Sequence, residues 1–251
     1  MMNPFTTGIA ALKIITEVNR YNSYEKQFQA LYEAGDYEGE QELIRQVQQD
    51  VIPAICRKCG FDISVEGEEN LPDKGPFMIY ANHQGFVDIF AIVIALKDHQ
   101  IGFIAKDEWR KFRPIARAIK NTKSVFLVRN NPREAVKVVS EAKALMDKGY
   151  NMAIFPEGTR SRGAEMSEFK AGAYKFAQKA NVPIVPLTVE GSYRAFEEHG
   201  TYKPAHIDII IHPAVHIENM DKKEQKEAFA QVEKTVRDGI AEIRSRQAKE
   251  D

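Results

Sequence analysis

One short stretch decides the fold that this sequence predicts: Asn82-His83-Gln84-Gly85-Phe86-Val87-Asp88. Two apolar runs flank it. The first, Phe77 to Ala81, has the length of a buried strand, and the second, Ile89 to Leu96, is interpreted as a helix. The polar residues between the runs then lie at the C-terminal end of a strand. Open α/β sheets place their functional sites at that edge.

His83 and Asp88 can form a hydrogen-bonded pair on this turn. The carboxylate would select one tautomer of the imidazole and stabilise its protonated form. The other ring nitrogen would then be free to accept a proton from a hydroxyl. Since a His and an Asp in one loop more often form a turn or a helix cap, the pair needs a second signal.

That signal is a second polar cluster, Phe155-Pro156-Glu157-Gly158-Thr159-Arg160, which follows the short apolar pattern Met152 to Phe155. The pattern again predicts a strand that ends in polar residues. One strand end carries a candidate base and the other carries an arginine. Together they predict a substrate site at the edge of the sheet.

These two clusters, in this order, resemble the glycerolphosphate acyltransferases, and most of all the 1-acyl-glycerol-3-phosphate (lysophosphatidic acid) acyltransferases. The resemblance extends over about residues 60 to 217. Further blocks that agree are Phe126-Leu127-Val128-Arg129, Phe169-Lys170-Ala171-Gly172 and Val182-Pro183-Ile184-Val185-Pro186. A single block would be moderate evidence, whereas several blocks in the family's order are specific.

The resemblance implies transfer of a fatty acyl group from a thioester, on coenzyme A or acyl carrier protein, to the sn-2 hydroxyl of 1-acyl-glycerol-3-phosphate. The product would be phosphatidic acid, a phospholipid precursor. His83 would be the general base and Asp88 its partner. Since the sequence has no Gly-x-Ser-x-Gly elbow, we expect no covalent acyl-enzyme. We expect neither a metal nor a cofactor.

The acceptor carries a phosphate, and arginine suits bidentate phosphate binding. In similar enzymes the arginine of the second cluster contacts the acceptor, and glycine there permits close backbone approach. The expected substrate-binding residues are Lys106, Arg129, Glu157, Gly158, Thr159 and Arg160. Lys106 and Arg129 are included because each ends a predicted strand on the same edge. The alternatives are solvated charges for those two, and a loop-shaping ion pair between Glu157 and Arg160.

Two departures from the family pattern stand out. Gly85 occupies a position that is usually serine, two residues after the histidine. Asn121 and Thr122 stand where glycine is common. A hydroxyl missing near His83 bears on substrate detail more than on the class of reaction.

Composition bounds the class of protein. The chain has 251 residues, 43% hydrophobic and 28% charged, with a net charge of -1, so nothing indicates a nucleic-acid partner. No secretory signal pattern is evident, and no run reaches the ~18–20 apolar residues of a membrane span. We therefore expect a cytoplasmic protein that is peripheral on the cytoplasmic face of a membrane.

Strands alternate with helices from residue 61 onward, which predicts a mostly parallel central sheet covered by helices on both faces. Strands are expected at Phe61 to Val65, Pro183 to Val189, Ile207 to Ile211 and Val215 to Ile217, and a helix at Phe169 to Ala180. The predicted domains are an N-terminal helical segment, 1–60, and an α/β acyltransferase domain, 61–251.

The N-terminal segment shows apolar residues at helical spacing: Phe5, Ile9, Leu12, Ile15 and Val18. They either bury against the main domain or enter the lipid interface. Asp36 is expected to cap a later helix that Pro53 ends or kinks. Because Cys56 and Cys59 close that helix without other zinc ligands nearby, we interpret them as reduced structural cysteines.

Three alternatives to the leading hypothesis stay open. The acceptor could be another lysophospholipid, or water in a thioesterase. The third alternative is a non-catalytic lipid-binding protein of the same fold. The complete set of His83, Asp88, Glu157 and Arg160 argues against the last.

Overall fold

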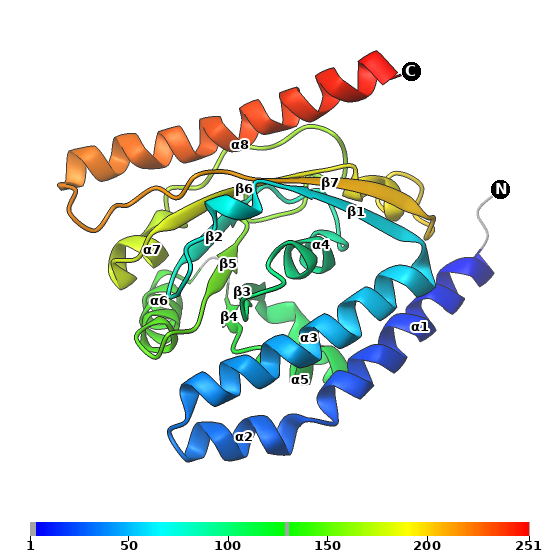
Figure 1. Ribbon diagram of the computed structural model, residues 1–251, viewed down its shortest axis with the longest axis horizontal. Helices are drawn as coiled ribbons and strands as arrows, with labels where there is room; N and C mark the ends of the chain where they lie inside the picture. Colours follow the sequence, from blue (N-terminus) through cyan, green and yellow to red (C-terminus); the bar gives the residue numbers. More distant parts are fainter. Residues whose placement is uncertain (1–3, 129–130, 251) are drawn as a thin grey trace.

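Short strands between helices build one seven-stranded sheet in the computed structural model, which describes residues 4–128 and 131–250 (Figure 1). The strands are β1 (Phe61–Glu66), β2 (Met78–Ala81), β3 (Gly102–Lys106), β4 (Val125–Leu127), β5 (Met152–Ile154), β6 (Ile184–Glu190) and β7 (Ala205–Ile211). Their order is β1-β7-β6-β2-β5-β3-β4. Only the β6–β7 pair is antiparallel among these described strands, so the predicted mostly parallel sheet is confirmed.

The helices are α1 (Pro4–Asn22), α2 (Glu25–Glu33), α3 (Tyr37–Cys59), α4 (Asp88–Ala95), α5 (Arg113–Asn121), α6 (Pro132–Met146), α7 (Tyr174–Ala180) and α8 (Lys222–Glu250). Short 3-10 turns are η1 (Glu68–Asn70), η2 (Asp107–Lys111) and η3 (Ser192–Ala195). Figure 1 shows α8 lying across one side of the sheet, with α4 and the three N-terminal helices on the other.

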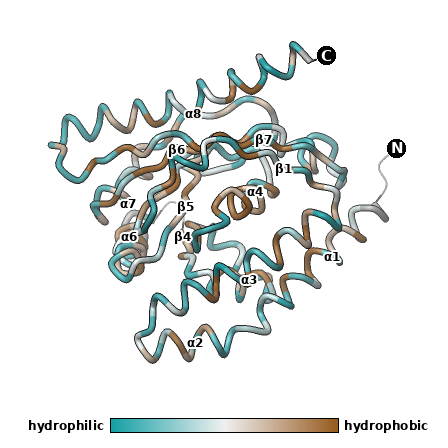
Figure 2. Tube along the Cα trace, in the orientation of Figure 1, coloured by the Kyte–Doolittle hydropathy of each residue, from teal (hydrophilic) through white to brown (hydrophobic). Residues whose placement is uncertain are grey.

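Successive side chains along a strand point to opposite faces of the sheet, so one strand contributes apolar residues to both covered faces. In β2, Ile79 and Ala81 pack in the cluster that includes α4. Met78 and Tyr80 pack in the opposite cluster, with α6, α7 and α8. Because β2 is covered on both sides, its residues are all apolar and buried, and Figure 2 shows the central strands and α4 in brown. The prediction of helices on both faces is confirmed.

The N-terminal helices form a third apolar cluster with Tyr150. Asp36 caps α3 as expected, since its Oδ1 accepts the amide of Gly39 at 2.9 Å. Pro53 does not end this helix, which continues to Cys59. Burial of Val51 and Ile55 on either side of Pro53 holds the helix together where one backbone donor is missing.

The apolar residues of α1 do not all bury against the rest of the described structure. Ala10, Ile14 and Tyr21 are buried, whereas Ile9 and Leu12 are 40% and 68% exposed. The side chain of Phe5 lies outside the described part of the chain. None of the helices within the described ranges is long and apolar enough to span a bilayer.

Two expected boundaries are wrong. The segment Val215–Ile217 makes only one isolated bridge, from Val215 to Ile184, because the chain turns away after it toward α8. The helix expected from Phe169 begins at Tyr174, and the residues before it pack as a loop. Pro114 occupies the first turn of α5, where no partner exists for the N–H that proline lacks.

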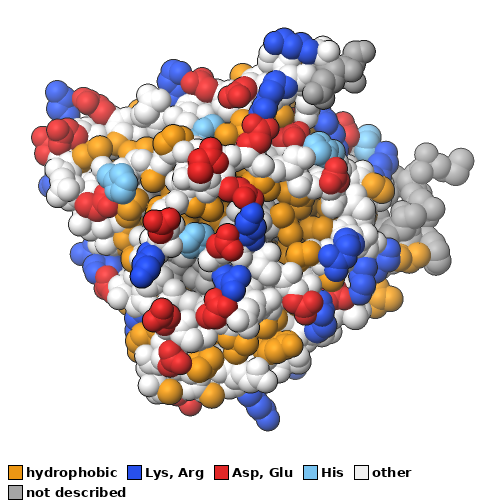
Figure 3. Space-filling view, in the orientation of Figure 1, with side chains coloured by type: hydrophobic (Ala, Val, Ile, Leu, Met, Phe, Trp, Pro, Cys, Tyr) orange, Lys and Arg blue, Asp and Glu red, His pale blue; other side chains and the backbone are white. Residues whose placement is uncertain are grey.

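Charge is distributed without a single-sign field on the face shown in Figure 3, where acidic and basic side chains are interspersed. Charged side chains also pair locally, as Lys143 does with Asp147 and Lys234 with Asp238. Exposed pairs of this kind contribute little to stability. The stability of the fold therefore depends mainly on the two apolar layers that sandwich the sheet.

Replacing Val236 by alanine tests the α8 layer. Val236 is fully buried in the cluster shared by α8 and the sheet. Its loss should lower the free energy of unfolding by about 2 kcal/mol, because the truncated site leaves a cavity. The matched control is Val136→Ala on α6, where the side chain is 65% exposed and the change should stay within about 0.5 kcal/mol. Urea unfolding measures both, and equal losses would contradict this packing.

Candidate active site

The two polar clusters meet where neighbouring strands β2 and β5 end. After β2 the chain enters α4 on one face of the sheet, and after β5 it leads to α7 on the other face. Loops that leave adjacent parallel strands in opposite directions open a crevice between them. The predicted strand-end site is therefore located at a switch point of the sheet.

His83 and Asp88 are in direct contact, with His83 Nδ1 2.6 Å from Asp88 Oδ2. The same carboxylate oxygen accepts the amide of Gly85 at 3.0 Å. Since an ionised carboxylate only accepts, Nδ1 carries the proton and donates it, which leaves Nε2 as the basic nitrogen. The ring of Phe155 stacks on the imidazole at 3.8 Å and restricts its orientation.

Asp88 is fully buried at the first turn of α4, where a negative charge is favoured by the helix dipole. Its second oxygen, Oδ1, accepts the hydroxyl of Ser192, which is equally buried in η3. Sequence reasoning missed Ser192. The signal was present in Glu190-Gly191-Ser192, a third polar cluster at the end of a predicted strand.

Glu157 accepts hydrogen bonds from two backbone amides of the site. Its Oε1 accepts the amide of His83 at 2.6 Å, and its Oε2 accepts the amide of Ser167 at 2.8 Å. Burial raises the pKa of Glu157, and the two amide donors oppose that rise. The alternative of an ion pair between Glu157 and Arg160 is wrong, because Arg160 pairs with a different carboxylate.

That carboxylate belongs to Glu197, whose Oε1 lies 2.9 Å from Arg160 Nη1. The guanidinium also stacks over the ring of Phe86 at 3.6 Å. A further backbone contact, from the amide of Ser161 to the carbonyl of His83 at 2.7 Å, ties the Arg160 loop to the His83 loop. The structure thus brings His83, Asp88, Glu157 and Arg160 into one connected site.

The other predicted substrate-binding residues take different positions. Gly158 adopts φ +69°, which an L side chain rarely adopts, so glycine is required in this turn. Thr159 is exposed beside it. Lys106 ends β3, one strand beyond β5 in the sheet, and is partly exposed. Arg129 lies outside the described residues.

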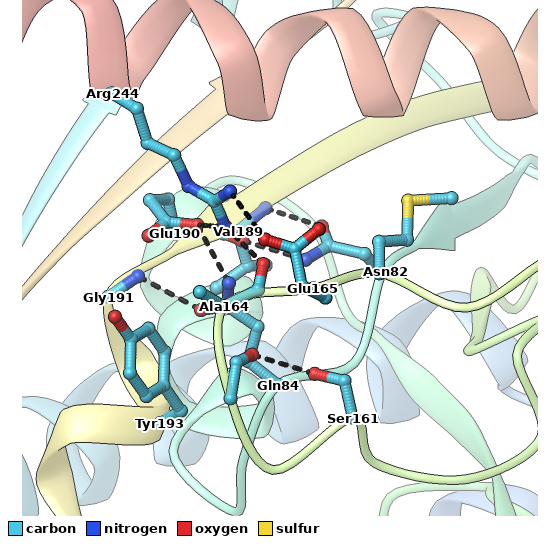
Figure 4. Close-up of polar contacts among 12 residues, drawn as sticks. Asn82, Gln84, Ser161, Ala164, Glu165, Val189, Glu190, Gly191, Tyr193 and Arg244 are labelled. Atoms are coloured by element: carbon cyan, nitrogen blue, oxygen red, sulfur yellow. Dashed lines mark hydrogen bonds and ion pairs between the residues drawn. The ribbon is translucent and has the colours of Figure 1, made fainter. Parts of the chain in front are cut away.

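A network of polar side chains joins the loop after β2 to β6 (Figure 4). Asn82 exchanges two hydrogen bonds of 2.8 Å with the backbone of Val189. Gln84 Nε2 donates to Glu190 Oε2 at 2.7 Å. Arg244, which reaches down from α8 in Figure 4, donates to the same oxygen at 3.1 Å and to the carbonyl of Ala164. The first cluster is therefore held to β6, and α8 is held to both β6 and the loop after β5.

Comparisons with known proteins identify similar chains. The family model described as "Acyltransferase" matches residues 62–190, more than half of the chain. The chain is 33% identical over 159 residues to the chloroplastic 1-acyl-sn-glycerol-3-phosphate acyltransferase LPAT1 of Arabidopsis thaliana, covering 62% of this chain and 44% of that protein. It is 30% identical over 167 residues to the 1-acyl-sn-glycerol-3-phosphate acyltransferase alpha of Mus musculus, covering 64% and 57%.

The chain thus spans about half the length of the curated relatives it matches. A solved structure is similar over nearly its whole length. The crystal structure of the 1-acyl-sn-glycerophosphate (LPA) acyltransferase PlsC from Thermotoga maritima matches with a TM-score of 0.76 and 26% identity. That match covers 97% of this chain and 98% of the other, so the N-terminal helices are included in the likeness.

Replacing Ser192 by alanine tests the support of Asp88. The variant leaves a buried carboxylate oxygen without its donor, which should cost about 1–3 kcal/mol of unfolding free energy. Ser140→Ala, at an exposed serine on α6, is the matched control and should change stability by less than about 0.5 kcal/mol. Thermal or urea unfolding gives both values, and an unchanged Ser192 variant would refute this role.

Proposed function

Because residues 62–190 match its model, the chain belongs to the acyltransferase family, and on that premise we propose that it acylates the free sn-2 hydroxyl of 1-acyl-glycerol-3-phosphate. The acyl group would come from a thioester of coenzyme A or acyl carrier protein, and the product would be phosphatidic acid for phospholipid synthesis. The observation that carries the proposal is the His83–Asp88 pair on the same sheet edge as Arg160. The activity for which the relatives and the similar structure are named supports this acceptor.

In this mechanism His83 Nε2 accepts the proton of the acceptor hydroxyl as its oxygen attacks the thioester carbonyl. The tetrahedral intermediate then collapses, the carbon–sulfur bond breaks, and the thiolate leaves. The proton held by His83 passes to that sulfur. Asp88 stabilises the imidazolium through Nδ1 during these steps, as a carboxylate does in hydrolase triads.

The acceptor itself is the nucleophile in this proposal. The cysteines support that choice, because burial raises the pKa of Cys56 to about 12 and also raises the pKa of Cys59. A thiol that stays protonated at neutral pH is a poor nucleophile. Both lie in the last turn of α3 as free thiols. We propose that they are structural.

We propose that Arg160 binds the acceptor phosphate. Its guanidinium has five N–H donors, and within the described ranges it donates only to Glu197. The remaining donors suit two phosphate oxygens. Gly158 and Thr159 would shape the approach to Arg160, and Glu157 would hold that loop to the backbone of His83. Lys106 and Arg129 complete the proposed set as further positive charges along the edge.

The protein would meet its lipid substrates at a membrane surface, on the cytoplasmic face. The support is the exposed side of α1, where Ile9 and Leu12 are 40% and 68% exposed. Large exposed aliphatic side chains on an amphipathic helix suit insertion at the headgroup level. In this arrangement α1 through α3, residues 4–59, would dock the α/β domain on the bilayer.

Thiol release from a long-chain acyl-coenzyme A, with and without 1-acyl-glycerol-3-phosphate, tests the reaction. We expect acceptor-dependent release, and His83→Ala should slow it by ~10²–10⁴-fold because the general base is lost. His216→Ala is the matched control, since that histidine is 70% exposed on the loop after β7.

Other outcomes of this assay separate the alternatives. Release without acceptor would identify a thioesterase. If coenzyme A thioesters give no release, the same assay with acyl carrier protein thioesters decides between another donor and a non-catalytic protein. Release that is equally fast in His83→Ala would overturn the assignment of the base.

Replacing Leu12 by glutamate tests membrane docking. The change places a charge where we propose an aliphatic anchor, and it should weaken binding to vesicles by about tenfold. Val136→Glu changes another exposed aliphatic residue, on α6, and should leave vesicle binding intact. Vesicle flotation measures both variants. Equal binding of wild type and Leu12→Glu would exclude this surface.

A further inference from the structure

Glu197 joins three loops of the site through one carboxylate. It follows η3, and its Oε1 accepts both the Phe86 amide and Arg160 Nη1, each at 2.9 Å. Its side chain is only 3% exposed. Phe86 comes from the loop after β2 and Arg160 from the loop after β5. The contact therefore sets the position of one loop relative to the other.

Gly85 provides the space that Glu197 occupies. A Cβ built on Gly85 would lie 2.5 Å from Glu197 Oε2, closer than real Cβ contacts allow. That oxygen is buried and has no hydrogen-bond partner among the described residues. A side chain at residue 85 would displace the carboxylate. Gly85, the departure from the serine of similar sequences, and Glu197 therefore depend on each other.

Arg160 is held in place before any ligand binds. Glu197 takes one N–H, and the Phe86 ring covers one face of the guanidinium at 3.6 Å. Long arginine side chains otherwise lose rotamer freedom when they bind a ligand, which weakens binding. A guanidinium that a carboxylate and an aromatic ring already fix loses less rotamer freedom when the ligand binds. Burial raises the pKa of Glu197, and Arg160 opposes that rise.

We propose that Glu197, admitted by the missing side chain of Gly85, is the positioning residue of Arg160 and sets how tightly the site binds the phosphate of the acceptor. This inference rests on the proposed function, since it takes Arg160 as the phosphate ligand. It adds a carboxylate from outside the sequence motifs and gives a role to Gly85 within the first of them. Glu197 does not touch the reacting atoms, so its effect should fall on acceptor binding.

Glu197→Ala should raise the KM for 1-acyl-glycerol-3-phosphate by about tenfold or more, the effect of a lost hydrogen bond to a charged group. The KM for the acyl donor should stay as in wild type. Glu197→Gln keeps an oxygen that can accept from Phe86 and Arg160, so its KM for the acceptor should be close to that of wild type. The matched control is Glu198→Ala, whose side chain is 43% exposed. Equal acceptor KM values in wild type and Glu197→Ala would overturn the proposal.

Gly85→Ala tests the shared space. Alone, it should raise the acceptor KM much as Glu197→Ala does, because its Cβ displaces the carboxylate. In Glu197→Ala the space is empty, so the double variant should be no worse than Glu197→Ala. Additive effects would overturn the dependence between the two residues, because independent sites add. Unfolding free energies of the same four proteins should show the same non-additivity.

A binding measurement separates this inference from the proposed function. Trp109 is the one tryptophan of the chain, and its ring centroid lies 5.7 Å from that of Phe86, the ring under the Arg160 guanidinium. We therefore expect its fluorescence to change when the acceptor binds, without turnover. We expect a Kd for 1-acyl-glycerol-3-phosphate about tenfold weaker in Glu197→Ala. Binding that is unchanged would overturn this inference while the proposed function stands. A wild type without acceptor-dependent thiol release would overturn the proposed function, and the unfolding measurements would still decide the Gly85–Glu197 contact.

Discussion

The buried carboxylate of Asp88 is the constraint on which the site depends. A fully buried charge is costly unless every oxygen is hydrogen-bonded, and Asp88 meets that requirement with three donors from different segments. His83 and Gly85 come from the loop after β2, and Ser192 comes from η3. The two segments must therefore adopt this arrangement together. The hydrogen bonds that Asp88 requires also fix the orientation of the His83 ring.

Two further carboxylates extend the same principle. Glu157 accepts backbone amides of His83 and Ser167, and Glu197 accepts the amide of Phe86 together with Arg160. Each links segments that are far apart in the sequence. Their burial gives them little access to ligand, so they shape the site and leave direct contact to His83 and Arg160. Preorganised geometry of this kind is what efficient acyl transfer requires.

The sheet explains why these loops meet. β2 lies between β5 and β6, so three strand ends with polar residues are adjacent, although more than a hundred residues separate the first from the last. α4 and α8 cover opposite faces and hold the strands in register. The N-terminal helices pack through their own apolar cluster, which leaves Ile9 and Leu12 of α1 exposed.

The sequence by itself determined the α/β class, the mostly parallel sheet and the two strand-end clusters, because apolar periodicity and strand-terminal polar residues are local signals. Asp36 as a helix cap is local in the same way. The partners of Ser192 and Glu197 were decided only by tertiary structure, since β6 must lie beside β2 before either residue can reach its partner. The partner of Arg160 and the exposed side of α1 also depended on packing. Side chains that look equivalent in the sequence differ in partner and exposure once the chain is folded, because long-range contacts set both.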